Sequence, residues 1–143
     1  MTDSTLIRMA NGDQYVATRD NFTYAGVRRR TVDLERLWRL FQIRVDREEA
    51  TFLVRTLAET FDLTMPKLSF TGRSDGRGTY YHIGQRIVVH HHPRVEILCH
   101  ELAHHWVETK MVGAPDAIHG CDFIHRADRL SAEAESIVTQ LGW

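Results

Sequence analysis

Apolar residues recur every three or four positions in four stretches of the chain, and this spacing predicts four helices. Thr31 is placed to cap the first helix, which would run through TVDLERLWRLFQI. Asp46 and Glu49 have the layout of a capping box, and the apolar stripe after them predicts a second helix ending near Phe61.

The third and fourth helices are expected in the second half of the chain. Pro93 suits the first position of a helix through PRVEILCHELAHHWVETKM, and Gly113 suits the position that ends it. The stripe that starts near Phe123 predicts a C-terminal helix ending at Gly142.

Strand signals lie before and between these helices. KLSFT, TYYHI and RIVVH read as short strands, and Gly84-Gln85 predicts a two-residue II′ turn between the last two. Residues 1–30 are expected to form a hairpin around Asn11-Gly12 or a flexible arm. The order of helices, strands and two further helices predicts an α+β fold with a small, mostly antiparallel sheet.

Composition narrows the class of protein. With 143 residues, 43% of them apolar and 26% charged, the chain is expected to fold as one globular domain, residues 1–143. No apolar run reaches the roughly 18 residues that would span a bilayer, and the N-terminus lacks a signal-peptide pattern. We therefore expect no membrane contact and a cytoplasmic location.

The third predicted helix carries candidate metal chemistry. His100 and His104 are four residues apart, so their imidazoles lie on one helix face and can reach a single ion. Glu101 borders that face. This HExxH pattern is typical of zinc hydrolases, in which the metal lowers the pKa of its water to about 7 and the glutamate acts as general base.

A catalytic zinc usually takes three protein ligands, so a third must come from elsewhere in the chain. Metzincin spacing would place a histidine at position 110, but that residue is Lys110. Glu133 and Glu135 are candidates if the C-terminal helix crosses the site. His119 is the better candidate, because it follows a loop containing glycine and proline and directly precedes the last helix.

HELAH at 100 to 104, followed after residues 105–118 by HGCDF at 119 to 123, resembles the SprT-like zinc metalloproteases. The resemblance covers about residues 65 to 140 and implies a minimal zincin-like domain. It implies His100, His104 and His119 as Zn²⁺ ligands, Glu101 as the base, and Phe123 as a packing residue beneath the site. A CxxC pair for that family's common zinc ribbon is not found in this sequence.

The leading hypothesis is therefore a zinc metalloendopeptidase that cleaves protein or peptide substrates, with DNA-associated proteins as a substrate class implied by the resemblance. The alternative is an inactive, zinc-stabilised module that binds nucleic acid through Arg28, Arg29 and Arg30. Hydrolysis of a non-peptide amide is a third hypothesis. Between Arg19 and Arg47 there are eight arginines and four acidic residues, although the net charge is −1. Such a cluster can meet phosphates electrostatically, but it is more often a solvated surface.

Several side chains close to these candidates in the sequence are not assigned to the metal site. His90 and His91 should point to opposite faces of their strand, so they are not expected to share an ion. His105 is expected at the surface or supporting a ligand, and one of Tyr80 and Tyr81 should face the core. Cys99 and Cys121 are expected to be small buried apolar residues. The roles of Glu108 and Cys121 and the oligomeric state stay open.

Overall fold

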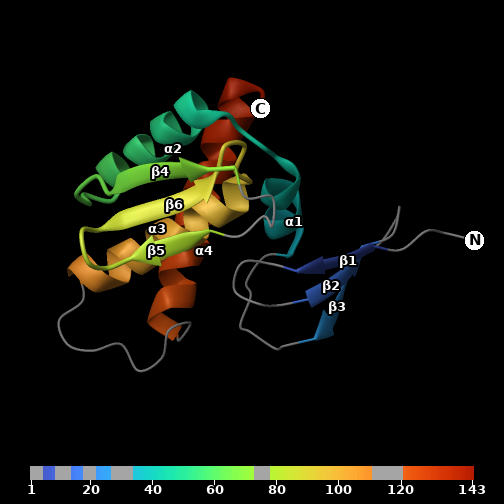
Figure 1. Ribbon diagram of the computed structural model, residues 1–143. Helices are drawn as coiled ribbons and strands as arrows, with labels where there is room; N and C mark the ends of the chain where they lie inside the picture. Colours follow the sequence, from blue (N-terminus) through green and yellow to red (C-terminus); the bar gives the residue numbers. More distant parts are fainter. Residues whose placement is uncertain (1–4, 9–13, 18–21, 27–33, 73–77, 111–120) are drawn as a thin grey trace, which may run out of the picture.

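The computed structural model describes residues 5–8, 14–17, 22–26, 34–72, 78–110 and 121–143 (Figure 1). Four helices and two three-stranded sheets make up this part of the chain. The predicted α+β class is therefore confirmed.

The N-terminal sheet has the strand order β1-β2-β3 and is antiparallel throughout, with β1 at Thr5–Arg8, β2 at Gln14–Ala17 and β3 at Phe22–Gly26. Its first two strands pair as the predicted hairpin, from Thr5 opposite Ala17 to Arg8 opposite Gln14. The Asn11-Gly12 turn lies outside the described residues. The third strand was not predicted.

The second sheet is mixed rather than mostly antiparallel. It consists of β4 (Lys67–Thr71), β5 (Thr79–Tyr81) and β6 (Arg86–His90), in the order β4-β6-β5. The hairpin strands β5 and β6 are antiparallel, while β4 joins the other edge of β6 in the parallel direction. In the described part of the chain, β4 and β5 are therefore the edge strands of this sheet.

The turn between β5 and β6 is longer than the predicted II′ turn. The last strand pair joins Tyr81 and Arg86, so the connection covers residues 82–85. Within it the amide of Gln85 donates to the carbonyl of His82 (3.2 Å), and both Gly84 (φ 83°) and Gln85 (φ 49°) have left-handed backbones. The two central residues of the turn are Ile83 and Gly84, one position earlier than the predicted pair Gly84 and Gln85.

The helices are α1 (Leu34–Gln42), α2 (Arg47–Thr60), α3 (Val95–Lys110) and α4 (Cys121–Leu141). The capping box of α2 is confirmed: the Asp46 carboxylate accepts from the Glu49 amide, and the Glu49 carboxylate accepts from the Asp46 amide, both at 2.8 Å. The C-terminus of α4 is confirmed at Gly142, whose left-handed backbone lets the Trp143 amide donate to the Val138 carbonyl. Thr31 and Gly113 lie outside the described residues.

Helix α3 begins at Val95, two residues after the proline predicted to start it. The reason is a tertiary contact with the segment between α1 and α2. The Pro93 carbonyl accepts from the Val45 amide (3.0 Å), and the Val95 amide donates to the Ile43 carbonyl (2.9 Å). This strand-like pairing keeps residues 93 and 94 outside the helix.

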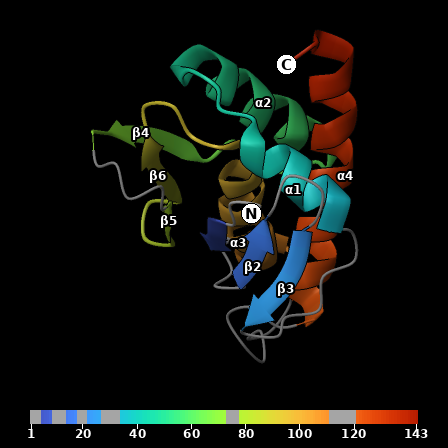
Figure 2. The same cartoon turned by 90° about the vertical axis from the view of Figure 1, so that its right-hand side faces the viewer.

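Helix α3 is the central layer of the molecule. Viewed as in Figure 2, the β4-β6-β5 sheet lies on one side of α3 and α4 lies on the other. Almost every residue of α3 from Val95 to Val107 is buried, and the apolar ones join side chains from the sheet and the other helices in one core. A helix covered on all sides has no solvent face for its polar residues, so those side chains need partners in the interior.

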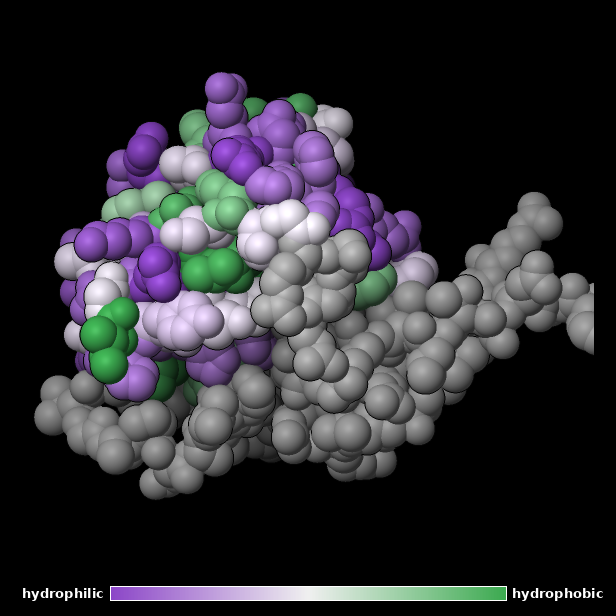
Figure 3. All heavy atoms as spheres, viewed as in Figure 1, coloured by the Kyte–Doolittle hydropathy of each residue, from purple (hydrophilic) through white to green (hydrophobic). Residues whose placement is uncertain are grey.

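The outward face of the second sheet is largely polar. Figure 3 shows small, separate apolar areas on the described part of this face. The large apolar side chains that are exposed come from several parts of the chain: Phe52, Met65, Tyr81, Ile83 and Leu141.

None of the described helices is both long and apolar enough to cross a membrane.

Candidate metal and catalytic site

Buried polar side chains concentrate on α3. Among the described residues with buried polar or charged side chains, four belong to this helix (Glu96, His100, Glu101 and His105) and one, Ser131, belongs to α4. Burying an ionisable group costs free energy unless it is paired or neutral. Two carboxylates and two imidazoles in one buried helix therefore indicate a site with a chemical role.

The imidazoles of His100 and His104 converge. Their Nε2 atoms are 3.3 Å apart, with the rings edge to face at a centroid distance of 4.9 Å. Two Zn–N bonds add up to about 4.1 Å, which is longer than the separation of the two nitrogens, so one zinc ion can bond both. The N–Zn–N angle would then be about 107°, close to the tetrahedral value. This pair of donors fits zinc.

Glu101 lies beside this pair in a buried position. Its Oε1 atom is 3.9 Å from His100 Nε2, and the residue is 4% exposed. Burial, and to a lesser extent the negative charge of Glu96, raises the pKa of Glu101 from 4.5 to about 8. A carboxyl group with its pKa near neutrality can both accept and release a proton under physiological conditions.

Phe123, in the first turn of α4, forms an apolar wall against both rings. Its ring centroid is 4.9 Å from that of His100 and 4.5 Å from that of His104. The residue is buried, at 3% exposure. Phe123 is thus a packing residue of both histidine rings.

Gly78, directly before β5, packs closely on Glu101 and its neighbour Ile97. A Cβ atom at this position would lie 2.7 Å from Ile97 Cγ2 and 3.0 Å from Glu101 Cγ. Gly78 is therefore required by close packing on α3, while residues 73–77 before it lie outside the described residues.

The described residues do not supply the third metal ligand. They contain no group of three or more His, Cys, Asp or Glu side chains that could hold a metal. Glu135 lies near Arg36 (3.8 Å) and Arg39 (3.9 Å) instead, and Glu133 joins no such group. His119 and the Cys121 side chain lie outside the described residues, so His119 stays a prediction.

His105 is fully buried, so of its two expected positions, at the surface or supporting a ligand, the surface position is wrong. Its Nε2 is 2.8 Å from the carbonyl oxygen of Thr64, and its Nδ1 is 2.9 Å from the hydroxyl of Tyr80. A carbonyl oxygen only accepts, so Nε2 carries the proton and, in the neutral ring, Nδ1 accepts from Tyr80. Burial lowers the pKa of His105 and favours this neutral form.

The two tyrosines of β5 face opposite ways, as predicted. Tyr80 packs inward on His105, while Tyr81 is 48% exposed. Burial, and then the nearby Glu108 carboxylate, raises the pKa of the Tyr80 hydroxyl well above its usual value, so this hydroxyl keeps its proton. Glu108 is exposed, and its carboxylate is a second hydrogen-bond acceptor for the Tyr80 hydroxyl, besides His105 Nδ1.

Other candidate groups belong to structural contacts. His91 Nδ1 accepts from the Arg47 guanidinium (Nε at 3.2 Å), and the His90 Nδ1 atom accepts from the His92 amide. Cys99 is buried, and its burial raises the pKa of the thiol, which keeps it protonated as expected for an apolar core residue. Arg28, Arg29 and Arg30 lie outside the described residues.

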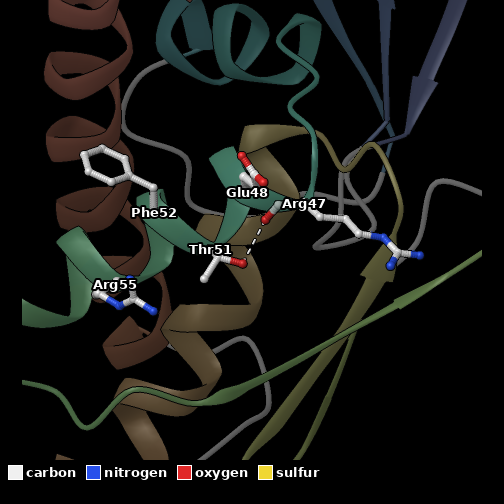
Figure 4. A pocket seen from close by; sticks show the side chains of 5 residues that line it. All are labelled: Arg47, Glu48, Thr51, Phe52 and Arg55. Atoms are coloured by element: carbon white, nitrogen blue, oxygen red, sulfur yellow. Dashed lines mark hydrogen bonds between the residues drawn. The ribbon is translucent and has the colours of Figure 1, made fainter.

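An open depression of about 330 Å³ lies on the outer face of α2, away from these groups. Figure 4 shows that all its lining side chains come from that helix: Arg47, Glu48, Thr51, Phe52 and Arg55. The Thr51 hydroxyl donates to the Arg47 carbonyl within the helix. None of the predicted site residues lines it.

Two residues near the site were missed in the sequence. Glu96 lies one turn before His100 at the same four-residue spacing that revealed His104, so its position was available from the pattern. Gly78 carried no such signal, because its role depends on a contact between segments that only the fold brings together.

Comparison with known proteins does not identify a family for this chain. The chain matches no protein-family model, no curated protein and no solved structure.

Proposed function

We propose that the protein is a zinc-dependent metallopeptidase with a minimal zincin-like domain of the SprT-like type. The observation that carries this proposal is the 3.3 Å approach of His100 Nε2 and His104 Nε2 beside the buried Glu101 carboxyl. In this proposal His100, His104 and His119 bind Zn²⁺ and Glu101 is the general base.

Chain length supports His119 as the third ligand. Phe123 packs on both histidine rings, and His119 precedes it by four residues. Four residues of extended chain span at most about 14 Å, so the imidazole at 119 stays within reach of the pair. A ligand from this segment would leave one zinc position open, as catalytic zinc requires.

Zinc, when bound, would acidify water and polarise the carbonyl of the scissile peptide bond. Glu101 takes the proton from the attacking water at its carboxylate and then gives it to the leaving amine nitrogen. The burial of Glu101, with Gly78 packed closely on its side chain, limits the access of bulk water to this carboxylate. Proton transfer by a positioned group of this kind contributes roughly 10²–10⁴-fold to the rate.

The substrate class follows from the strand order. Strand β5 is an edge of the second sheet and begins next to Glu101, so an extended peptide can pair with β5 through main-chain hydrogen bonds. Such pairing tolerates many sequences. We therefore propose exposed or unfolded protein segments as substrates, and the sequence resemblance extends this class to DNA-associated proteins.

The decisive experiment compares the wild type with Glu101→Gln in cleavage of casein and histone. The variant keeps the size of the side chain but cannot accept a proton, so we expect full zinc content and at least about a 100-fold loss of rate. Glu59→Gln, on the exposed end of α2, is the matched control and should cleave normally. Cleavage by Glu101→Gln at the native rate would refute the general-base role.

A zinc-loaded wild type that cleaves neither substrate would instead favour the inactive binding module. In that case DNA binding should weaken as salt increases and when Arg28, Arg29 and Arg30 are neutralised.

A further inference from the structure

His105 connects three separate segments through one buried imidazole. It belongs to α3 and directly follows His104. Its Nε2 donates to the carbonyl of Thr64, in the connection between α2 and β4, and its Nδ1 accepts from the hydroxyl of Tyr80 in β5. The rings of Tyr80 and His105 also pack edge to face, with centroids 5.6 Å apart. The contacts tie the connection before β4 and the edge strand β5 to α3.

A second contact fixes the same strand one helical turn away. Gly78 lies two residues before Tyr80 and packs on Ile97 and Glu101 so closely that a Cβ atom would not fit. Ile97, Glu101 and His105 follow one another at intervals of four residues, so they form one stripe along α3 that faces β5. The candidate base therefore lies on the same stripe as the histidine that binds Tyr80.

The two stripes of α3 have different partners. His100 and His104 contact Phe123 of α4, whereas Ile97, Glu101 and His105 contact the segment from Gly78 to Tyr80. Besides its pairing with β6, strand β5 is therefore held on α3 by the close-packed Gly78 and by the Tyr80–His105 hydrogen bond. Removing that hydrogen bond would free the strand to shift without changing the metal-binding histidines.

We propose that Tyr80 and His105 are positioning residues that hold β5 in the register at which a bound peptide meets Glu101. This inference rests on the proposed peptidase function. Neither residue touches the reacting atoms: both act through the strand on which the substrate would dock. Misplacement of a substrate by about 1 Å can lower the rate up to about 100-fold, so loss of the Tyr80–His105 hydrogen bond should lower kcat.

The test is Tyr80→Phe, which removes one hydroxyl and keeps the ring. We expect kcat to fall about 10-fold, with KM within about 3-fold and zinc content unchanged, because the substrate still binds but is misaligned. Tyr81→Phe is the matched control: Tyr81 is exposed on the same strand, and its contact with Arg86 involves the ring that phenylalanine retains. A purely structural role would lower thermal stability without moving kcat at 25 °C.

A second measurement does not depend on catalysis. In the zinc-loaded protein, Tyr80→Phe should raise amide hydrogen exchange of residues 79–81 about 5-fold, while Tyr81→Phe should leave it unchanged. If the wild type cleaves no peptide, the proposed function fails, and the exchange data alone show whether the Tyr80–His105 hydrogen bond holds β5 in place. Unchanged exchange, or an unchanged kcat in an active enzyme, would overturn the inference.

Discussion

Glu101 is the residue on which the proposed chemistry depends. It is buried at 4% exposure, and burial together with Glu96 raises its pKa to about 8. In the metal-free protein this carboxyl is therefore largely protonated at neutral pH. A dication beside it would favour the charged form, so we expect zinc binding to release a proton and to tighten as pH rises.

The raised pKa of Glu101 also predicts a pH dependence of stability. The unfolded chain loses this proton near pH 4.5 and the folded protein near pH 8, so between these values the folded state binds more protons. The free energy of unfolding of the metal-free protein should therefore fall as pH rises from 4.5 to 8, by on the order of 3 kcal/mol from this group. Urea unfolding at pH 5 and pH 8.5 measures the change.

Glu101→Gln cannot titrate and should lack this contribution, so the metal-free variant should be more stable than the wild type at pH 8.5 and similar to it at pH 5. Glu59→Gln, at an exposed position, should keep the decline. An identical pH profile for wild type and Glu101→Gln would show that this carboxyl is not protonated in the fold.

The sequence predicts the local part of the site and misses the part that depends on tertiary contacts. His100, Glu101 and His104 are neighbours in the chain, and helical periodicity alone places them together. The partners of His105 are 41 and 25 residues away, at Thr64 and Tyr80. No spacing rule links those positions, so the sequence could not decide between a surface position for His105 and a supporting one, and the fold excludes the surface position.

At the scale of elements, the contact between β5 and α3 is set by the absence of a side chain at residue 78. Gly78→Ala would bring a Cβ within 2.7 Å of Ile97 and 3.0 Å of Glu101, so strand or helix must move. We expect a loss of about 1–3 kcal/mol in the free energy of unfolding, together with reduced cleavage. Thermal and urea unfolding measure the first effect.

Gly72→Ala is the matched control at the other end of the same connection. A Cβ there would meet only His91 Nε2, at 3.6 Å, which is an ordinary contact. We expect a change within about 0.5 kcal/mol. Equal effects of the two substitutions would mean that the packing at Gly78 is not tight.

Elements were predictable where the sequence carries its own stop and start signals. Asp46 and Glu49 cap α2 through local hydrogen bonds, and Gly142 ends α4 through its left-handed backbone. The start of α3 was predicted two residues early because Pro93 and Val95 bind the distant segment at Ile43 and Val45. Short-range rules describe the former ends well because the hydrogen bonds that set them join residues three to five positions apart.

At the scale of the whole molecule, the position of α3 between the sheet and α4 links metal binding to global stability. The two candidate ligands within α3 cannot separate without disturbing a helix packed on both sides. Zinc at 100 times its Kd should therefore stabilise the fold by about 2.7 kcal/mol, or roughly 5–10 °C in Tm. Thermal unfolding with zinc and with a chelator measures the difference.

His104→Ala should abolish this response to zinc, because it removes one of the two converging nitrogens. His125→Ala, at an exposed position of α4, should retain it. A full zinc response in His104→Ala would place the metal elsewhere.

The ion pair between Arg36 of α1 and Asp128 of α4, 92 positions apart at a distance of 3.0 Å, has a consequence for biosynthesis. A ribosome must translate almost the entire sequence before α1 meets its partner. Until Phe123 emerges, the imidazoles at 100 and 104 lack their aromatic wall. The pair of imidazoles therefore gains its aromatic neighbour only after the start of α4 has been synthesised, later than the rest of α3.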